Sequence, residues 1–378
     1  MRLYITGGGT GGHVTPGLAI ARYFEQKYPD TVVRFAGSAR GIENKLVPRE
    51  GYPLDTIEII GLSRAISFGG IAHNIKAARL ALSAVGKAKK LLKKAQPDCV
   101  IGCGGYASFA TLRAAQQLGI PTVLLEVNAL PGKVTRLLAK KADRVLVCFQ
   151  QAKDILGGGD KIVLTGAPVR GEILAASRQK ARAKFGLSDD DQLVVSFWGS
   201  MGAKYMNEHM AGAIALECKN NVPYHHIHAT GAAARDWLPE LAAKQGADLA
   251  AHPNIEITEY IYDMADRLAA ADLVVCRAGA ATLGELCMLG RPALLVPSPF
   301  VAENHQEKNA RALEAAGGCR VLLEKDASPM RLYDEMQKML SDRVRLRRMG
   351  QQATKLAAHD AGDKIHREIL WAVEHHRT

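Results

Sequence analysis

Long apolar runs are missing from this sequence. No stretch reaches the roughly 18 consecutive apolar residues that a membrane-spanning helix needs. The seven cysteines are scattered, odd in number and never spaced as Cys-x-x-Cys, so we expect neither a disulfide framework nor a zinc site. The N-terminus lacks the apolar core and the cleavage site of a secretory signal. Together these absences predict a chain that works in a reducing cytosol.

Aromatic residues are also few, at 6 %, whereas 36 of the 378 residues are glycine. This balance favours an α/β protein with many tight turns over an all-β sandwich. The length predicts two domains.

Acidic residues are scarce in the first half. Residues 1–165 hold 23 Lys and Arg against 11 Asp and Glu, a net charge of +12, whereas residues 166–378 carry −1. The asymmetry predicts an anionic partner for the first half, either nucleic acid, anionic lipid or a phosphorylated ligand. Residues 71–95 contain seven Lys and Arg and no acid, with apolar residues at helical spacing. Such a stretch suits an anionic membrane surface, and equally a core-packed helix with a solvated charged face.

Strand-like and helix-like segments alternate along the chain, which predicts parallel sheets with helices on both faces. In the first half we expect strands at 3–6, 32–36, 54–60, 99–102, 122–126 and 144–148, and helices at 16–28, 71–95, 107–118 and 133–141. In the second half we expect strands at 193–197, 224–229, 255–258, 273–276, 293–297 and 320–323, with helices after 328. Residues 162–169 contain Gly-Ala-Pro, which favours a linker. The predicted domains are 1–165 and 166–350, with a C-terminal helix in 351–378 that packs back toward the first domain.

A glycine-rich turn, GGGTGGH at 7–13, follows the first strand and opens a helix. Backbone N–H groups at such a turn bind anions, and His13 is placed to act as a base or to contact phosphate. A dinucleotide site also expects an acidic residue at the end of the second strand, and Phe35-Ala36-Gly37-Ser38 offers none. A second glycine loop, GCGGYAS at 102–108, and Glu126-Val127-Asn128 also follow predicted strands. In a parallel sheet these loops share the edge where ligands bind, although helix capping and close packing would place the same residue types there.

The second half repeats this arrangement. WGSMGA at 198–203 and CRAGAATLGE at 276–285 are strand-to-helix turns, and Glu285 is placed to accept two hydrogen bonds from a ribose diol. The polar segment around Gln306 suits sugar hydroxyls. Ser188-Asp189-Asp190-Asp191 matches a metal-binding Asp-x-Asp motif formally, but it precedes a strand far from the glycine turns. We therefore interpret it as a solvated turn and expect no metal site.

Eight motifs in order resemble the MurG family of glycosyltransferases over nearly the whole chain. They are GGGTGGH at 7–13, GCGGYAS at 102–108, EVNALPG at 126–132, GAPVR at 166–170, GSMGA at 199–203, EYIYDM at 259–264, CRAGAATLGE at 276–285 and HQEKN at 305–309. The resemblance implies the GT-B fold, in which the parallel sheets of two Rossmann-like domains face each other across a crevice. It also implies transfer of N-acetylglucosamine from UDP-GlcNAc to lipid I, the undecaprenyl-diphosphate-linked muramoyl peptide, at the cytoplasmic face of the membrane.

The resemblance assigns residues by motif. It implies a donor site of Thr10, Gly11, Gly12, Asn128, Arg170, Ser200, Ile261, Ala280, Ala281, Thr282, Leu283, Gly284, Glu285 and Gln306. Uracil would be held by the backbone of Ile261, and His13 would be the catalytic base. On the acceptor side the candidates are Gly104, Gly105, Tyr106 and Glu126. The chain departs from the family's usual residues at Trp198, Met201, Ala167 and Val127.

No cofactor and no nucleic acid are implied; the expected partners are UDP-GlcNAc, lipid I, an anionic membrane surface and proteins of cell-wall synthesis and division. The competing classes are a nicotinamide or flavin oxidoreductase, a non-catalytic membrane-docking or nucleotide-binding module, and a UDP-GlcNAc 2-epimerase. The missing ribose carboxylate counts against the oxidoreductase, and polar clusters in both halves count against the module. Release of UDP without an acceptor would favour the epimerase.

Overall fold

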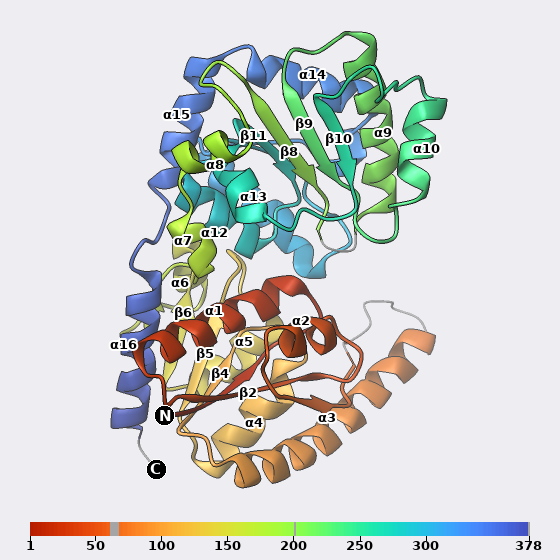
Figure 1. Cartoon of the computed structure of the whole chain (residues 1–378). Helices are drawn as coiled ribbons and strands as arrows, with labels where there is room; N and C mark the ends of the chain where they lie inside the picture. Colours follow the sequence, from red (N-terminus) through yellow and green to blue (C-terminus); the bar gives the residue numbers. More distant parts are fainter. Residues whose placement is uncertain (61–67, 200–201, 377–378) are drawn as a thin grey trace. The chain divides into compact units, whose positions relative to one another are not determined.

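The computed structural model describes residues 1–60, 68–199 and 202–376, with the backbone alone at 68–78, 82 and 302. The chain divides into two compact units (Figure 1). Unit 1 comprises Met1–Val169 and Ala358–Thr378, and unit 2 comprises Arg170–Ala357. Each contains one wholly parallel sheet with helices packed on it, which confirms the prediction of an α/β chain with two Rossmann-like units.

The sheet of unit 1 has the strand order β3-β2-β1-β4-β5-β6-β7. Its strands are β1 (Arg2–Thr6), β2 (Val32–Ser38), β3 (Leu54–Ile57), β4 (Cys99–Gly102), β5 (Thr122–Glu126), β6 (Arg144–Val147) and β7 (Ile162–Leu164). Every residue of β4 and β5 is buried. Helices cover both faces of a sheet of this kind, so its central strands are apolar without alternation.

The expectation of a linker over residues 162–169 is wrong for its first three residues. They form β7, which pairs with β6 at the edge of the sheet. The chain leaves the sheet after Leu164 and turns at Gly166, whose φ is +78°. A three-residue edge strand needs little apolar sequence, so the neighbouring Gly-Ala-Pro signal concealed it.

Helices cover the two faces of the unit 1 sheet (Figure 1). The helices are α1 (Gly11–Lys27), α2 (Glu43–Arg49), α3 (Phe68–Ala95), α4 (Ser108–Leu118), α5 (Lys133–Leu138), α6 (Gln150–Ile155) and α16 (Ala361–His375), with a 3-10 turn at Ala139–Lys141. α1 packs against α2 and α16, while α3 packs against α4. In the described side chains of α3, Val85 and Leu92 are buried in the core. The lysines 87, 90, 93 and 94 are exposed, so this part of the apolar stripe faces the core.

The C-terminal helix α16 is tied into unit 1 by charged and aromatic contacts. The Arg144 Nε donates to Glu368 Oε2 at 2.6 Å, in a pair whose side chains are largely buried. The Arg144 guanidinium also lies over the ring of Trp371, and Lys27 Nζ lies 2.7 Å from Asp363 Oδ1. These contacts bring residues from the two ends of the chain together in one unit.

The sheet of unit 2 has the order β10-β9-β8-β11-β12-β13. Its strands are β8 (Leu193–Phe197), β9 (His225–Ala229), β10 (Ile255–Thr258), β11 (Leu273–Cys276), β12 (Ala293–Leu295) and β13 (Cys319–Val321). Its helices are α7 (Gly171–Ala175), α8 (Arg178–Lys184), α9 (Lys204–Lys219), α10 (Trp237–Lys244), α11 (Met264–Ala270), α12 (Ala280–Leu289), α13 (His305–Ala315), α14 (Pro329–Leu340) and α15 (Arg343–Thr354), with 3-10 turns at Ala302–Asn304 and Glu324–Asp326. A large apolar cluster joins α9, α10 and α14 to this sheet. None of the helices in the described ranges of either unit is long and apolar enough to cross a bilayer.

A row of buried polar side chains runs through the core of unit 2. The Ser196 Oγ lies 2.7 Å from His226 Nε2 and 2.7 Å from His228 Nδ1. The outer nitrogens of the two rings contact Glu217 Oε2 at 2.8 Å and Asn207 Oδ1 at 3.1 Å. Burial lowers the pKa of His228 to about 3, so this ring is neutral and shares hydrogen bonds without charge. The sequence hinted at this row only through two histidines two residues apart on one strand, which therefore share a face.

A buried carboxylate holds the first glycine loop of unit 1. Glu43 of α2 is 0 % exposed. Its Oε2 accepts the Gly9 N–H at 2.9 Å, and its Oε1 accepts both the N–H and the hydroxyl of Ser38, at 2.8 and 2.6 Å. A Cβ at Gly8, Gly37 or Gly41 would collide with this side chain. One carboxylate therefore requires all three glycines. The sequence analysis missed Glu43 because it looked for an acid at the end of the second strand, whereas Glu43 lies on the helix that follows.

Replacing Glu43 by Ala should loosen unit 1 at this loop. The Gly9 and Ser38 donors lose their acceptor, and each buried donor left unsatisfied costs about 1–3 kcal/mol. We expect faster amide hydrogen exchange in peptides covering 7–13 and 36–40, with peptides of unit 2 unchanged, measured by mass spectrometry. Glu50→Ala is the matched control, since Glu50 pairs with Arg22 at the surface and exposed pairs contribute little. Equal exchange in the two variants would contradict the anchoring role of Glu43.

Candidate functional site

The strand order of unit 1 reverses between β1 and β4. These strands are neighbours, with Thr6 opposite Gly102 at their carboxyl ends, yet the chain continues from them to opposite sides of the sheet. Ligands of open α/β sheets bind at such a switch point. The two glycine loops, 7–12 and 103–107, both begin there.

The two loops approach each other more closely than side chains would allow. A Cβ on Gly105 would collide with the Gly8 carbonyl, and one on Gly104 would lie 2.7 Å from His13 Nδ1. Both residues also have positive φ, +95° at Gly104 and +76° at Gly105. On the outer side a Cβ on Gly9 would reach the Tyr106 ring at 3.2 Å. The structure thus brings His13, Gly104, Gly105 and Tyr106 together in unit 1.

His13 is oriented by a backbone carbonyl from the second loop. Its Nδ1 lies 3.1 Å from the Cys103 oxygen, and Cys103 is itself anchored by its N–H to the Thr6 carbonyl at 2.7 Å. A carbonyl only accepts hydrogen bonds, so Nδ1 carries the proton and the lone pair of the neutral ring lies on Nε2. The half-buried His13 therefore has the tautomer that a general base needs at Nε2.

Only part of the first loop offers donors to an anion. The Gly9 N–H already donates to Glu43. Thr10 is exposed, and Gly11 and Gly12 begin α1, whose first turn contains no acidic residue. An anion at this loop would be bound by the N-terminus of α1, at Thr10, Gly11 and Gly12, and not by the whole turn.

Glu126 at the end of β5 is fully engaged within its own loop. Its Oε1 accepts the backbone and side-chain N–H groups of Asn128, both at 3.1 Å. Its Oε2 accepts the Gly132 N–H at 2.9 Å and the Thr135 hydroxyl at 2.6 Å. With four donors on a carboxylate that is 3 % exposed, Glu126 fixes the loop that presents Asn128.

Unit 2 has its own switch point between β8 and β11. Phe197 lies opposite Cys276 at the carboxyl ends of these strands. The turn after β11 leads into α12, which begins at Ala280 and has no acidic residue in its first turn. In the predicted donor-site segment 280–285, Ala280 and Leu283 are buried. Ala281, Thr282 and Gly284 are half-buried.

Glu285 is paired with Arg170, another predicted donor-site residue that lies far away in the sequence. The Arg170 Nε donates to Glu285 Oε1 at 2.7 Å, and the carboxylate side chain is 10 % exposed. Burial raises the pKa of Glu285, and the charge and hydrogen bond of Arg170 oppose that rise. The arginine therefore favours the charged carboxylate, which is the form that accepts hydrogen bonds from hydroxyl groups.

Trp198 replaces a glycine of the family pattern and is buried in unit 2, at 4 % exposure. The Arg277 guanidinium lies 5.7 Å from the centre of its indole ring. Arg277 also donates to the Val296 carbonyl at 3.0 Å and pairs with Glu324 at 2.5 Å, while burial lowers its pKa. This arginine links the loops after β11 and β12. Sequence reasoning noted the tryptophan and missed its partner.

Gln306 and Ile261 are the remaining donor-site candidates in the described part of unit 2. The Gln306 Oε1 accepts the Ser298 N–H at 2.8 Å, which ties α13 to the loop after β12. Ile261 follows β10, is 2 % exposed, and lies between Tyr260 and Tyr262, whose rings meet edge to face at 5.1 Å. Ser200 and Met201 lie outside the described residues.

The Asp-x-Asp match is a hydrogen-bonded turn. Asp191 Oδ2 accepts both the N–H and the hydroxyl of Ser188, at 2.7 and 2.8 Å. Across the part of the chain that the structure describes, no three His, Cys, Asp or Glu side chains are grouped so that they could hold a metal ion.

Comparison with known proteins places both units in one family. The sequence profile of the "Glycosyltransferase family 28 N-terminal domain" matches residues 3–147, and that of the "Glycosyltransferase family 28 C-terminal domain" matches residues 193–365. Among solved structures, MurG of Acinetobacter baumannii superposes with a TM-score of 0.74 at 28 % identity, covering 98 % of this chain and 99 % of that one. A UDP-GlcNAc 2-epimerase from Neisseria meningitidis superposes at 0.65 with 14 % identity, covering 98 % of this chain and all of that one. This second likeness shows the fold alone.

Sequence identity over the whole chain distinguishes a transferase from an epimerase. A protein of Acetivibrio thermocellus is 42 % identical over 370 residues, covering 98 % of this chain and 97 % of that protein. It is named UDP-N-acetylglucosamine–N-acetylmuramyl-(pentapeptide) pyrophosphoryl-undecaprenol N-acetylglucosamine transferase. The two proteins are similar over nearly their full length, and this chain carries both family 28 domains. The chain therefore belongs to the family of these N-acetylglucosamine transferases, which are GT-B glycosyltransferases.

Proposed function

We propose that this protein transfers N-acetylglucosamine from UDP-GlcNAc to the C4 hydroxyl of the muramoyl sugar of lipid I, with inversion at the anomeric carbon, and so makes lipid II for peptidoglycan synthesis. The observation that carries this proposal is the 42 % identity, over 98 % of the chain, to a transferase named for this reaction. The experiment that tests it supplies radiolabelled UDP-GlcNAc and a lipid I analogue and looks for a labelled disaccharide lipid. Release of UDP without an acceptor, and no disaccharide, would favour a 2-epimerase instead.

Unit 2 supplies the donor site in this proposal. Glu285, held charged by Arg170, accepts hydrogen bonds from the ribose diol of UDP. The N-terminus of α12, over Ala280–Gly284, faces the diphosphate through the amides that precede Leu283, because the Leu283 N–H donates to the Gly279 carbonyl. The Ile261 backbone holds uracil, and Ser200 and Gln306 complete the donor contacts. UDP gains negative charge as it leaves, and amide groups already oriented by a helix stabilise that charge without reorganising. Thr10, Gly11, Gly12 and Asn128 of unit 1 serve the same donor.

His13 is the base in this mechanism. The acceptor hydroxyl attacks the anomeric carbon while its proton passes to His13 Nε2, and the bond from that carbon to the UDP oxygen breaks. General-base catalysis of this kind contributes roughly 10²–10⁴-fold. The Cys103 carbonyl keeps the proton on Nδ1, while Gly104, Gly105 and Tyr106 form the wall on the acceptor side. We assign Glu126 a positioning role in place of a catalytic one, because its carboxylate oxygens already accept four hydrogen bonds.

The acceptor is anchored in a bilayer, so the enzyme works at a membrane surface. We propose that it docks on the cytoplasmic face through charge on unit 1, where the lysines of α3 are exposed and its Val85 and Leu92 are buried. Each Lys or Arg close to an anionic surface contributes about 1 kcal/mol. Such docking is peripheral and reversible, and cell-wall and division proteins would meet the enzyme there.

Glu285→Gln should raise the KM for UDP-GlcNAc by roughly 10- to 100-fold, because the ribose diol loses charge-assisted hydrogen bonds worth about 1.5–3 kcal/mol. The glutamine keeps the shape of the buried side chain. Initial rates against donor concentration measure the change. Glu172→Gln is the matched control, since Glu172 is the second carboxylate near Arg170, at 3.8 Å, and is 75 % exposed. An unchanged KM in folded Glu285→Gln would remove Glu285 from the donor site.

His13→Ala should lower kcat by about 10²-fold or more and leave UDP binding nearly unchanged, since a base acts in the transition state. His13→Asn separates catalysis from anchoring: its amide can still donate to the Cys103 carbonyl, but it has no basic nitrogen. We expect single-turnover rates as low for the Asn variant as for the Ala variant. Recovery of kcat in His13→Asn would show that His13 only holds the two loops together.

Charge reversal on α3 should weaken membrane docking. Lys87, Lys90 and Lys94 lie at i, i+3 and i+7 and are exposed, so we expect their triple replacement by Glu to reduce sedimentation with anionic vesicles at low salt. Binding of the unaltered protein should also fall at high salt, because the Debye length shrinks from about 10 Å at 0.1 M to about 3 Å at 1 M. Turnover of a short-chain soluble acceptor should stay unchanged.

The matched control for this variant reverses three exposed lysines of unit 2, namely Lys219, Lys244 and Lys338, and so changes the net charge equally. An equal loss of vesicle binding in both variants would mean that total charge matters and not the basic face of α3. Binding to neutral vesicles that is as strong as binding to anionic ones would place docking elsewhere.

A further inference from the structure

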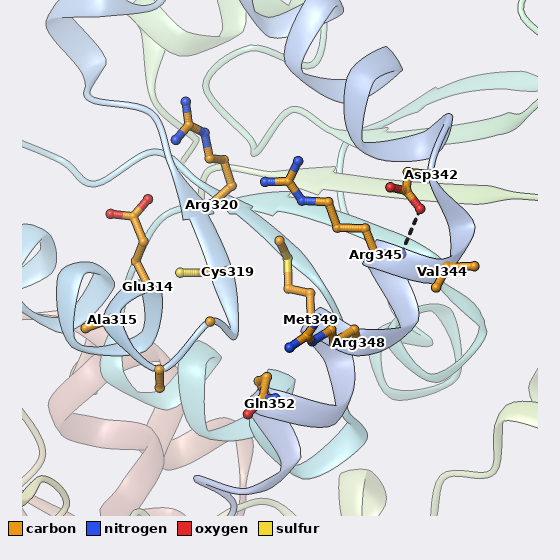
Figure 2. Close-up of a pocket in the computed structure, with 12 residues that line it drawn as sticks. Glu314, Ala315, Cys319, Arg320, Asp342, Val344, Arg345, Arg348, Met349 and Gln352 are labelled. Carbon is orange, nitrogen blue, oxygen red and sulfur yellow. Dashed lines mark hydrogen bonds between the residues drawn. The ribbon is translucent and has the colours of Figure 1, made fainter.

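A groove of about 850 Å³ lies in unit 2 between the edge strand β13 and helix α15 (Figure 2). Its lining residues are Glu314, Ala315, Ala316, Gly317, Cys319, Arg320, Asp342, Val344, Arg345, Arg348, Met349 and Gln352. None of them belongs to the loops at the β8 and β11 switch point, and the transfer mechanism uses none of them.

The two carboxylates of the groove are already engaged. Glu314 Oε1 accepts the Val321 N–H at 2.9 Å, and its Oε2 pairs with Arg311 at 2.6 Å. Asp342 Oδ1 accepts the Arg345 N–H at 2.9 Å and caps α15 (Figure 2). These acids therefore serve the fold, and the arginine side chains of the groove are not neutralised by them.

Two of the three arginines that line the groove lack a matching acid among the described residues. Arg345 and Arg348 are exposed, and within the described ranges neither has a carboxylate oxygen within 4.0 Å of its guanidinium. Arg320 shares Glu335 with Arg331, at 3.4 and 2.8 Å respectively. Figure 2 shows the side chains of Arg320 and Arg345 extending the same way from β13 and α15. Two elements thus present guanidinium groups to one groove.

Local stability does not explain this charge. The first turn of α15 contains no acidic residue, although cations there oppose the helix dipole. The helix sequence has four Arg and no Lys, whereas α3 has six Lys and one Arg. Residues 166–378 as a whole carry a net charge of −1. Arg binds carboxylates through two parallel N–H groups, which a Lys cannot do.

One backbone donor of the edge strand beside the groove is already occupied. The outward N–H of Val321 is occupied by Glu314, so a peptide cannot pair there with the backbone of β13. We therefore consider recognition by side chains. Val344, 71 % exposed, and the half-buried Met349 add an apolar surface next to the arginines.

We propose that this groove docks a short acidic peptide segment of a partner protein. Carboxylates of the segment pair with Arg345, Arg348 and Arg320, and one apolar side chain packs on Val344 and Met349. The concave shape favours a peptide over a bilayer, which attracts exposed basic surfaces without regard to their shape.

The test uses the full-length protein and the fluorescein-labelled probe Glu-Glu-Leu-Glu-Glu-Leu-Glu-Glu, followed by fluorescence anisotropy. We expect saturable binding that weakens with salt, and that the double variant Arg345→Ala/Arg348→Ala weakens by about tenfold or more. Arg347→Ala is the matched control, since Arg347 is exposed on the same helix but does not line the groove. Arg345→Lys/Arg348→Lys keeps the charge and should still bind more weakly, because the paired N–H geometry is lost.

Three outcomes would overturn the proposal. The first is equal binding of the probe with every Glu replaced by Gln. The second is a loss of affinity in the Arg347→Ala control as large as that in the double variant. The third is a double variant that no longer binds anionic vesicles but still binds the peptide. The last result would make the groove a lipid contact. Transfer to a soluble acceptor should be unchanged in the double variant, so failure of peptide binding and failure of the proposed transferase activity are distinguishable.

Discussion

The site of unit 1 depends on a close approach between two backbone loops. At the β1 and β4 switch point, Gly104 and Gly105 lie against His13 and the Gly8 carbonyl with no room for a Cβ. This contact lets the Cys103 carbonyl reach His13 Nδ1 and so decides which ring nitrogen can act as a base. A wider loop would leave the histidine without its orienting partner.

Three buried carboxylates support the two sites in different ways. Glu43 and Glu126 accept hydrogen bonds from backbone and uncharged side-chain donors, and each fixes a loop. Glu285 is paired with an arginine instead, which opposes the rise in its pKa that burial causes, and it lies in the middle of α12. Donors without charge hold a loop, whereas an arginine favours the charged form of the carboxylate that it pairs with.

The two basic helices illustrate two uses of positive charge. The described part of α3 buries Val85 and Leu92 and exposes lysines, which suits a diffuse attraction to an anionic surface. α15 instead places arginines along a groove next to an apolar wall. Lysine acts as a strongly hydrated point charge, while arginine supplies a planar fork of donors, so residue type as well as charge distinguishes the two surfaces.

The sequence by itself determined the α/β class, most of the strands and the turns where strands end, because apolar runs and glycine turns are local signals. It also placed the second glycine loop at a strand end, and His13 and Glu285 near the starts of the helices that follow two strands. Their roles are proposals. Only the tertiary structure decided that Glu43 holds the first loop, that Arg277 lies at Trp198, that Ser196 joins two histidines, and that β7 extends the sheet. Each of these depends on which segments become neighbours, and that is fixed by strand order and helix packing and not by any local pattern.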